Sequence, residues 1–134
     1  MLFSEQEITI MDKRKIIALA GILGALAVGI GAFGAHGLKD YLTSIDRLDT
    51  FETAVKYHFY HTLAILAIGV ALLYKENSHW KYAVYCWLSG IVIFSGSLYA
   101  LCLSNVSLLG AITPIGGIMF IVGWIFLATG TRKL

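Results

Sequence analysis

Charged and apolar positions are sharply separated along this chain. Residues 16–38, 57–74 and 82–131 contain no Asp, Glu, Lys or Arg, and every formal charge lies outside these three stretches. A helix needs about 20 apolar residues to cross a bilayer core of about 30 Å. The first two stretches therefore predict one transmembrane helix each, whereas the third is long enough for two.

The third stretch contains a break near its middle. Residues 103–107 read Leu-Ser-Asn-Val-Ser, and Ser and Asn favour turns over helix interiors because their side chains hydrogen-bond locally. We therefore expect transmembrane helices near 16–36, 50–74, 81–103 and 108–130. An open sheet leaves backbone groups unpaired in lipid, and the short alternating strands of a barrel are absent from the pattern. The predicted fold class is all-α: an integral membrane bundle of four transmembrane helices in a single domain, 13–134, after an N-terminal tail, 1–12.

The connection over 37–49 has a pattern of its own. Its apolar residues recur at helical spacing between charged ones, at Tyr41, Leu42, Ile45 and Leu48. This spacing predicts a short amphipathic helix lying at the membrane interface. Asp49 followed three residues later by Glu52 resembles a capping box, which predicts that the second long helix begins there.

Composition and charge support a membrane protein and suggest its orientation. Hydrophobic residues make up 58% of the chain and charged residues 13%, and the mean hydropathy is +0.79. Typical soluble domains contain about 25% charged residues, so a soluble globule is excluded. The side that holds both ends of the bundle carries most of the basic residues, at Lys13, Arg14, Lys15, Lys75, Lys81, Arg132 and Lys133. Only Lys39, Arg47 and Lys56 lie on the other side, which predicts that both termini are cytoplasmic.

The first span allows a second interpretation. A basic run at 13–15 ahead of an apolar segment is also typical of a secretory signal peptide. The apolar run is longer than the 7–15 residues of a typical signal core, and it is rich in glycine, which favours a retained span.

Small residues indicate how the helices pack, because membrane helices associate where their backbones approach closely. Gly21, Ala25 and Gly29 recur every four residues, so we expect the first span to be the central helix. The predicted packing residues are Gly21, Gly29, Gly31, Gly90, Gly116 and Pro114, the proline acting as a kink. The third span carries a face of large residues that we expect to meet lipid or another chain, at Trp87, Ile91, Phe94 and Leu98. Trp80 and Trp87 are also expected to belong to an aromatic belt at the inner surface.

Three histidines are predicted to lie at one level, near the outer membrane boundary. His36 ends the first span, and His58 and His61 open the second span from the same side. Tyr99 and Thr113 should reach this depth from the third and fourth spans, so these five residues form a candidate ligand pocket. No catalytic set, cofactor-binding motif or metal-ligand spacing is present, and the basic residues form no nucleic-acid stripe. No cofactor is assigned, and an enzyme is not expected.

Four short motifs resemble a known family. They read Gly-Ala-Phe-Gly-Ala-His-Gly-Leu at 31–38, Tyr-His-Phe-Tyr-His-Thr-Leu at 57–63, Phe-Ser-Gly-Ser-Leu-Tyr at 94–99 and Gly-Ala-Ile-Thr-Pro-Ile-Gly-Gly at 110–117. Together they resemble the small four-helix membrane-protein family of unknown function that includes YgdD and transmembrane protein 256. The resemblance implies a location in a bacterial cytoplasmic (inner) membrane, or in a mitochondrial membrane in a eukaryote. The motifs contain His36, His58, His61, Ser95, Tyr99, Thr113 and Pro114.

Three functions remain open at this point. The first is a structural or accessory protein that sits in the lipid bilayer and associates with another membrane protein or with itself as a homo-oligomer. The second is binding of a quinone, haem or metal at the histidine pocket, because imidazoles can hydrogen-bond a carbonyl or ligate iron and zinc. The third is a small transporter or channel subunit, for which charged residues inside the membrane are the usual indication.

Overall fold

A computed structural model describes residues 12–134, and most of the predicted tail, 1–12, lies outside this range. The chain forms the helices α1 (Lys13–Ala35), α2 (Lys39–Ser44), α3 (Leu48–Tyr74) and α4 (Ser78–Gly90). A π-helical turn, Ile91–Ser95, joins α4 to α5 (Gly96–Ser104). A 3-10 turn, Ser107–Ala111, precedes α6 (Thr113–Gly130), and a last 3-10 turn covers Thr131–Lys133.

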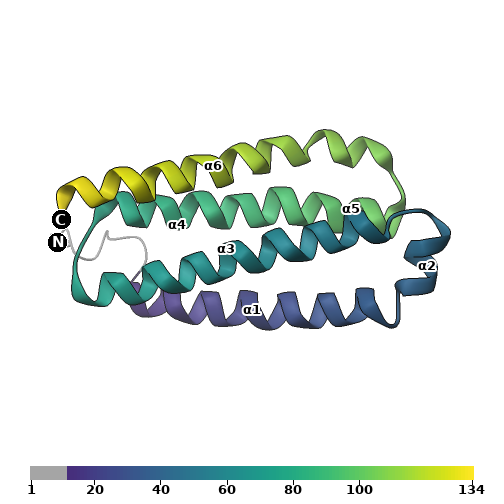
Figure 1. Cartoon of the computed structure of the whole chain (residues 1–134), viewed down its shortest axis with the longest axis horizontal. Helices are drawn as coiled ribbons and strands as arrows, with labels where there is room; N and C mark the ends of the chain where they lie inside the picture. Colours follow the sequence, from purple (N-terminus) through teal and green to yellow (C-terminus); the bar gives the residue numbers. More distant parts are fainter. Residues whose placement is uncertain (1–11) are drawn as a thin grey trace, which may run out of the picture.

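Four helical segments are long and apolar enough to cross a membrane, which confirms the predicted fold class. They cover 13–35, 48–74, 78–104 and 107–130. The third segment is one continuous rod made of α4, the π-helical turn and α5 (Figure 1). The start of α1 and the C-terminus lie at the same end of the bundle, as the even number of crossings requires (Figure 1).

At the other end of the bundle, the structure confirms the short helix predicted within 37–49 and the break predicted at 103–107, with one correction. The short helix α2 forms, and its Leu42 is fully buried beneath the ends of the long helices. Asn105 adopts the left-handed conformation that ends α5 at the predicted break. The capping box is wrong: α3 begins at Leu48 with Arg47 as its N-cap, and no side chain caps it. Leu48 packs against the core cluster around Leu42, so burial favours an earlier start of the helix.

The second and third spans form the centre of the bundle, and α1 and α6 flank them. The share of buried residues in the most apolar part of each span is 17% for the first and fourth and 39% for the second and third. Figure 1 shows α3 and α4 between α6 above and α1 below. The expectation that the first span is central was therefore wrong. Its small residues allow close packing, but only the face toward α3 uses them.

Large residues of the third span pack onto glycines of the fourth span at regular intervals of seven. Trp80 lies on Gly130, Trp87 on Gly123 and Phe94 on Gly116, and in the opposite direction Phe120 lies on Gly90. A Cβ atom added at Gly123 would lie 2.5 Å from the Trp87 indole. We call this series of contacts the aromatic–glycine ladder; it brings α4 and α6 together at close range.

The ladder corrects the predicted faces of the third span. Trp87, Ile91 and Leu98 are buried inside the bundle, whereas we expected them to meet lipid or another chain. Trp80 is buried too, so neither tryptophan belongs to an aromatic belt. The physical reason is that this span has helices on two sides, since α3 and α6 both pack against it. Both its small face and its large face are therefore covered.

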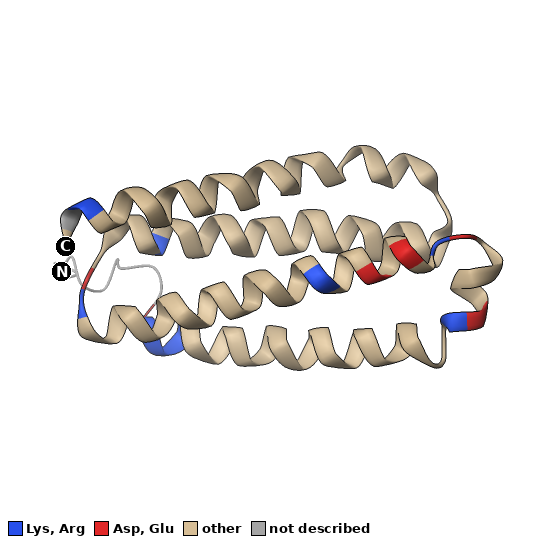
Figure 2. Ribbon diagram, viewed as in Figure 1, with Lys and Arg blue, Asp and Glu red and all other residues tan. Residues whose placement is uncertain are grey.

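Charged groups gather toward the two ends of the bundle, and along α3 they also continue inward from the end away from the start of α1 (Figure 2). At the end that holds the termini, the Glu76 carboxylate accepts hydrogen bonds from Lys81 at 2.8 Å and Lys13 at 3.2 Å. These hydrogen bonds lower the pKa of Glu76. Asn77 caps α4 and donates to the Gly130 carbonyl at 2.9 Å, so the connection 75–77, with Glu76 bound to Lys13, contacts all four spans.

Candidate functional site

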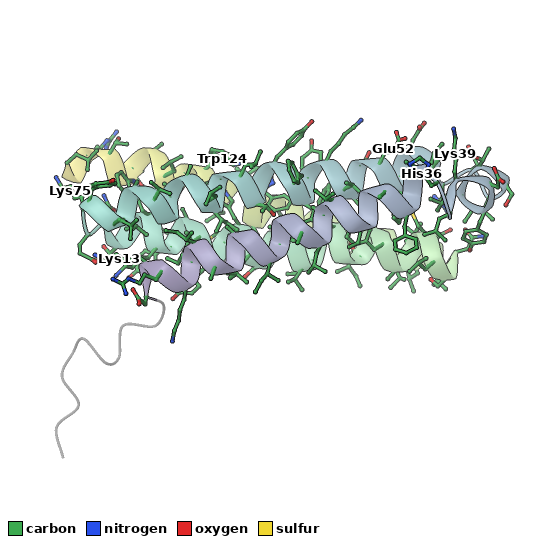
Figure 3. The ribbon with its side chains drawn as sticks, turned by 90° about the horizontal axis from the view of Figure 1, so that it is seen from below. Lys13, His36, Lys39, Glu52, Lys75 and Trp124 are labelled. Atoms are coloured by element: carbon green, nitrogen blue, oxygen red, sulfur yellow. The ribbon has the colours of Figure 1, made fainter. Side chains whose placement is uncertain are left out.

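Most of the buried polar side chains of the described residues lie in the half of the bundle away from the termini. His58, His61 and Thr62 come from α3, and Ser95 and Ser97 come from the third span. His36, by contrast, is exposed at the end of α1, beside Glu52 and Lys39 in Figure 3. Polar groups inside a membrane bundle are normally paired, so the partners of each one define its role.

His58 connects the second span to the third. Its Nδ1 lies 2.9 Å from the Tyr99 hydroxyl, and its backbone carbonyl accepts a hydrogen bond from Thr62 at 2.8 Å. The Nε2 atom is buried and has no hydrogen-bond partner among residues 12–134. The Ser95 hydroxyl donates to the Ala54 carbonyl at 2.7 Å one turn away, so α3 is bound to the third span by two buried hydrogen bonds.

His61 points instead toward α6. The Trp124 indole nitrogen donates to His61 Nε2 at 3.1 Å, and His61 Nδ1 lies 2.8 Å from the Tyr57 carbonyl oxygen. An indole N–H can only donate, so Nε2 must be the acceptor and the proton must be on Nδ1. The imidazole of His61 is therefore neutral, and both of its nitrogen atoms are occupied.

The five predicted pocket residues do not share one pocket. The structure brings together His58 and Tyr99, but His61 faces Trp124 and His36 faces the exterior. Thr113 shares a 2.6 Å hydrogen bond with Ser97, away from the histidines. The reason is geometric, because residues three apart on a helix diverge by about 60° and α3 is covered on more than one side. That divergence directs His58 and His61 to different neighbours.

The predicted packing residues likewise fall into different settings. Gly31 lies against Val55 of α3, and Gly90 and Gly116 belong to the aromatic–glycine ladder. A Cβ atom at Gly21 or Gly29 would meet nothing within 4 Å, so these two glycines contact no neighbouring helix in the bundle. Pro114 stands in the first turn of α6, where its missing N–H costs nothing, and not at a kink.

A groove of about 480 Å³ runs between α3 and α6, over Phe94 of the third span. We call it the α3–α6 groove. Its walls are mainly aromatic and include Tyr57, His61, Phe94, Phe120, Trp124 and Pro114. Sequence reasoning found His61 and Pro114 but missed Tyr57, Phe120 and Trp124. The aromatic residues at 120 and 124, one turn apart on the fourth span, could have indicated an aromatic face. The sequence does not show which helix this face meets, so it could not be paired with His61.

Metal or haem ligation finds little support in these residues. No group of three or more His, Cys, Asp or Glu side chains comes together within the described part of the chain. His61 would have to give up a hydrogen bond to bind a metal. His58 could offer its Nε2 atom, because its Nδ1 atom is already paired with Tyr99. Cys86 and Cys102 are buried free thiols in separate places.

Comparison with known proteins identifies the family. The family model described as "Protein of unknown function (DUF423)" matches residues 30–117, a stretch that contains all five predicted pocket residues. The chain belongs to the DUF423 family. This DUF423 protein is 48% identical to UPF0382 membrane protein SSP2132 of Staphylococcus saprophyticus, over 90% of the chain and 99% of that relative. It is 42% identical to UPF0382 membrane protein YwdK of Bacillus subtilis, over 89% of the chain and 98% of that relative.

A third relative confirms the resemblance found from the four motifs. UPF0382 inner membrane protein YgdD of Escherichia coli is 38% identical over 92% of the chain and 94% of its own length. No solved structure matches the DUF423 protein. The names of the relatives and the four apolar spans agree that it is a small multi-pass membrane protein.

Proposed function

We propose that this DUF423 protein is a structural or accessory membrane protein that associates with another membrane protein or with a second copy of itself. The supporting observation is the outer face of α1, formed by Gly21, Ala25 and Gly29. All three residues are exposed in the bundle, at a spacing of four. This spacing is typical of surfaces where two membrane helices meet at close range.

The contrast with other lipid-facing surfaces supports this proposal. Lipid-exposed positions elsewhere carry large side chains, such as Val92, Ile118 and Ile121. A glycine facing lipid leaves backbone exposed and has no side chain to pack. A partner helix could approach the α1 outer face closely, because nothing in the bundle lies within 4 Å of a Cβ placed at Gly21 or Gly29. We assign no catalytic role to the protein.

A transport function has less support. The core of the half that carries the termini is apolar and includes Ile65, Ile68, Leu72 and Trp87. The His61 ring lies at the edge of this layer, with its centroid 6.4 Å from that of Trp87, and both buried histidines are paired, His58 with Tyr99 and His61 with Trp124. An ion or proton path through a single copy would have to cross this layer without polar groups.

We infer that the protein lies in a bacterial cytoplasmic membrane with both termini in the cytoplasm. The bias of Lys and Arg toward the end that holds the termini supports this orientation, as Figure 2 illustrates. Cysteines introduced at Lys39 and Lys75 should react with an impermeant thiol reagent from opposite sides of the membrane. Equal labelling of both positions from one side would contradict this orientation.

The association is tested by substituting the α1 outer face. Chemical cross-linking in native membranes should capture the wild-type protein in complexes, with itself or with another membrane protein. Gly21→Leu and Gly29→Leu should reduce the captured fraction by about tenfold, because leucine prevents close helix approach. Val92→Leu is the matched control, since residue 92 is exposed on another face and a larger apolar side chain there meets only lipid.

Two outcomes would contradict the proposal. In the first, the wild-type protein is captured only as a monomer under the same conditions. In the second, complexes form but Val92→Leu weakens them as much as the glycine variants do. Thermal unfolding of each variant in detergent serves as a folding check, and Gly21 and Gly29 have open space for a side chain in the monomer.

A further inference from the structure

We infer that the α3–α6 groove binds a lipid-soluble molecule with a flat conjugated ring that carries a carbonyl oxygen, the chemistry of a membrane quinone. The groove is lined by side chains of α3, the third span and α6, and it holds about 480 Å³. Small-molecule sites typically have volumes of about 300–1,000 Å³, so a ring with a short part of an apolar tail fits. This inference does not depend on the α1 outer face.

Three of the rings that line the groove are nearly parallel, although His61 and Phe120 are each only 4% exposed and Phe94 is tilted by 54° from Phe120. The rings of His61 and Phe120 are stacked with centroids 3.6 Å apart and planes 9° apart. The Tyr57 ring lies 18° from the plane of His61 and 25° from that of Phe120. Aromatic rings gain an attraction against other rings beyond their area burial, an increment that a saturated acyl chain does not receive.

Hydrogen bonds hold this arrangement in place before any ligand binds. His61 is fixed at both nitrogen atoms, by the Trp124 indole at 3.1 Å and by the Tyr57 carbonyl oxygen at 2.8 Å. The helices on either side of the groove are thereby joined through its wall. A binding site formed by locked side chains loses little conformational entropy when a ligand enters.

One polar group of the groove is left for a ligand. The Tyr57 side chain is 41% exposed, and its hydroxyl makes no hydrogen bond within residues 12–134. Tyr57 is the first residue of the uncharged stretch 57–74, directly after Lys56, and therefore lies at the outer end of that stretch. A ring carbonyl oxygen is the acceptor that this hydroxyl lacks. The His61 and Trp124 N–H groups already donate within the protein, so they do not compete for it.

The position of the groove also favours a ligand that arrives from the bilayer. Its lining includes lipid-facing residues of α6, among them Ile118, Ile121 and Trp124. Trp124 is labelled in Figure 3 partway along the bundle, between the charged ends. A water-soluble ligand would have to cross the polar surface to reach this depth, whereas a membrane-dissolved quinone is already there.

Titration of the full chain in lipid nanodiscs with a short-tailed benzoquinone tests this inference. Quinones quench indole fluorescence on contact, and of the three tryptophans only Trp124 lines the groove. The buried Trp87 packs behind it with ring centroids 4.7 Å apart. The wild-type protein should show saturable quenching. Tyr57→Phe removes the free hydroxyl and should weaken binding about five- to tenfold. Tyr60→Phe is the matched control, because Tyr60 is 56% exposed on the same helix and does not line the groove.

Several results would overturn the inference. Quenching that rises linearly without saturation would show simple partition into the bilayer. Equal affinity of the Tyr57→Phe and Tyr60→Phe variants would show that the hydroxyl binds no carbonyl. Displacement of the quinone by a saturated long-chain alcohol at equal concentration would show that the groove accepts any chain. Both variants retain the aromatic ring, and a circular dichroism melt of each confirms that it is folded.

Discussion

A side chain introduced at Gly123 should destabilise the bundle strongly, because this glycine carries the middle step of the aromatic–glycine ladder. The Cβ atom of an alanine would lie 2.5 Å from both Cδ1 and Nε1 of Trp87. An ordinary contact needs at least 3.4 Å, so the helices or the indole must move by about 1 Å. Trp87 has no exposed surface and therefore no free space to move into. Overpacking of this kind costs about 1–3 kcal/mol.

The measurement is the free energy of unfolding of Gly123→Ala in detergent, titrated with sodium dodecyl sulfate and followed by circular dichroism at 222 nm. Gly29→Ala is the matched control, because it adds the same methyl group where nothing lies within 4 Å. Alanine is favoured over glycine inside a helix by about 0.5–1 kcal/mol, so we expect that control to be unchanged or slightly stabilised.

A second substitution tests whether the cost arises at the Trp87 contact. Trp87→Ala removes the ring that meets Gly123, so the double variant Trp87→Ala/Gly123→Ala should be less destabilised than the sum of the two single variants. The reasoning is refuted if Gly123→Ala unfolds like Gly29→Ala, or if the two substitutions are strictly additive.

Three further predictions concern the core and one end of the bundle. Ile91→Ala should lower the free energy of unfolding by about 2–5 kcal/mol and Val92→Ala by far less, because Ile91 is buried and Val92 is 71% exposed; equal effects in the same titration would contradict this. His58→Ala should cost about 1–3 kcal/mol by leaving the half-buried Tyr99 without its hydrogen-bond partner, and His58→Gln should recover part of this loss; a glutamine variant as unstable as the alanine variant would show that hydrogen bonding is not the cause. Hydrogen bonds from two lysines lower the pKa of Glu76 from its ordinary value of about 4.5. Their stabilisation is therefore present above that value and lost as the pH falls through the lowered pKa. Glu76→Gln should remove this part of the acid sensitivity, by less than about 1 kcal/mol because the site is exposed, and unfolding midpoints compared at pH 7 and pH 3 will measure it.

The number of spans and their limits could be predicted from the sequence because they depend on properties that run along the chain. Whether a segment can cross the membrane depends on its length and its lack of charge, and these are the same before and after folding. The break at Asn105 follows from local hydrogen bonding and from a residue that tolerates the left-handed conformation. The short helix α2 was also a local pattern, with Leu42 on its apolar side.

The side of each helix that faces the protein could not be predicted in the same way. Lipid is as apolar as the protein interior, so hydrophobicity does not distinguish a core residue from a lipid-facing one. The sequence contains aromatic residues at 80, 87 and 94 and glycines at 116, 123 and 130, and matching these two series of seven would have indicated the ladder. Side-chain size alone led us to place Trp87 on the outside of the bundle, whereas the structure buries it.

The candidate site shows the same division between local pattern and tertiary arrangement. The sequence by itself determined that His58 and His61 lie at nearby levels within the membrane, because two residues three positions apart on one helix are always separated by less than one turn. Only the tertiary structure decided that His58 meets Tyr99 and that His61 meets Trp124. Those partners depend on which helices pack on the two sides of α3, and close fits such as Trp87 on Gly123 select that arrangement from several that bury similar apolar surface.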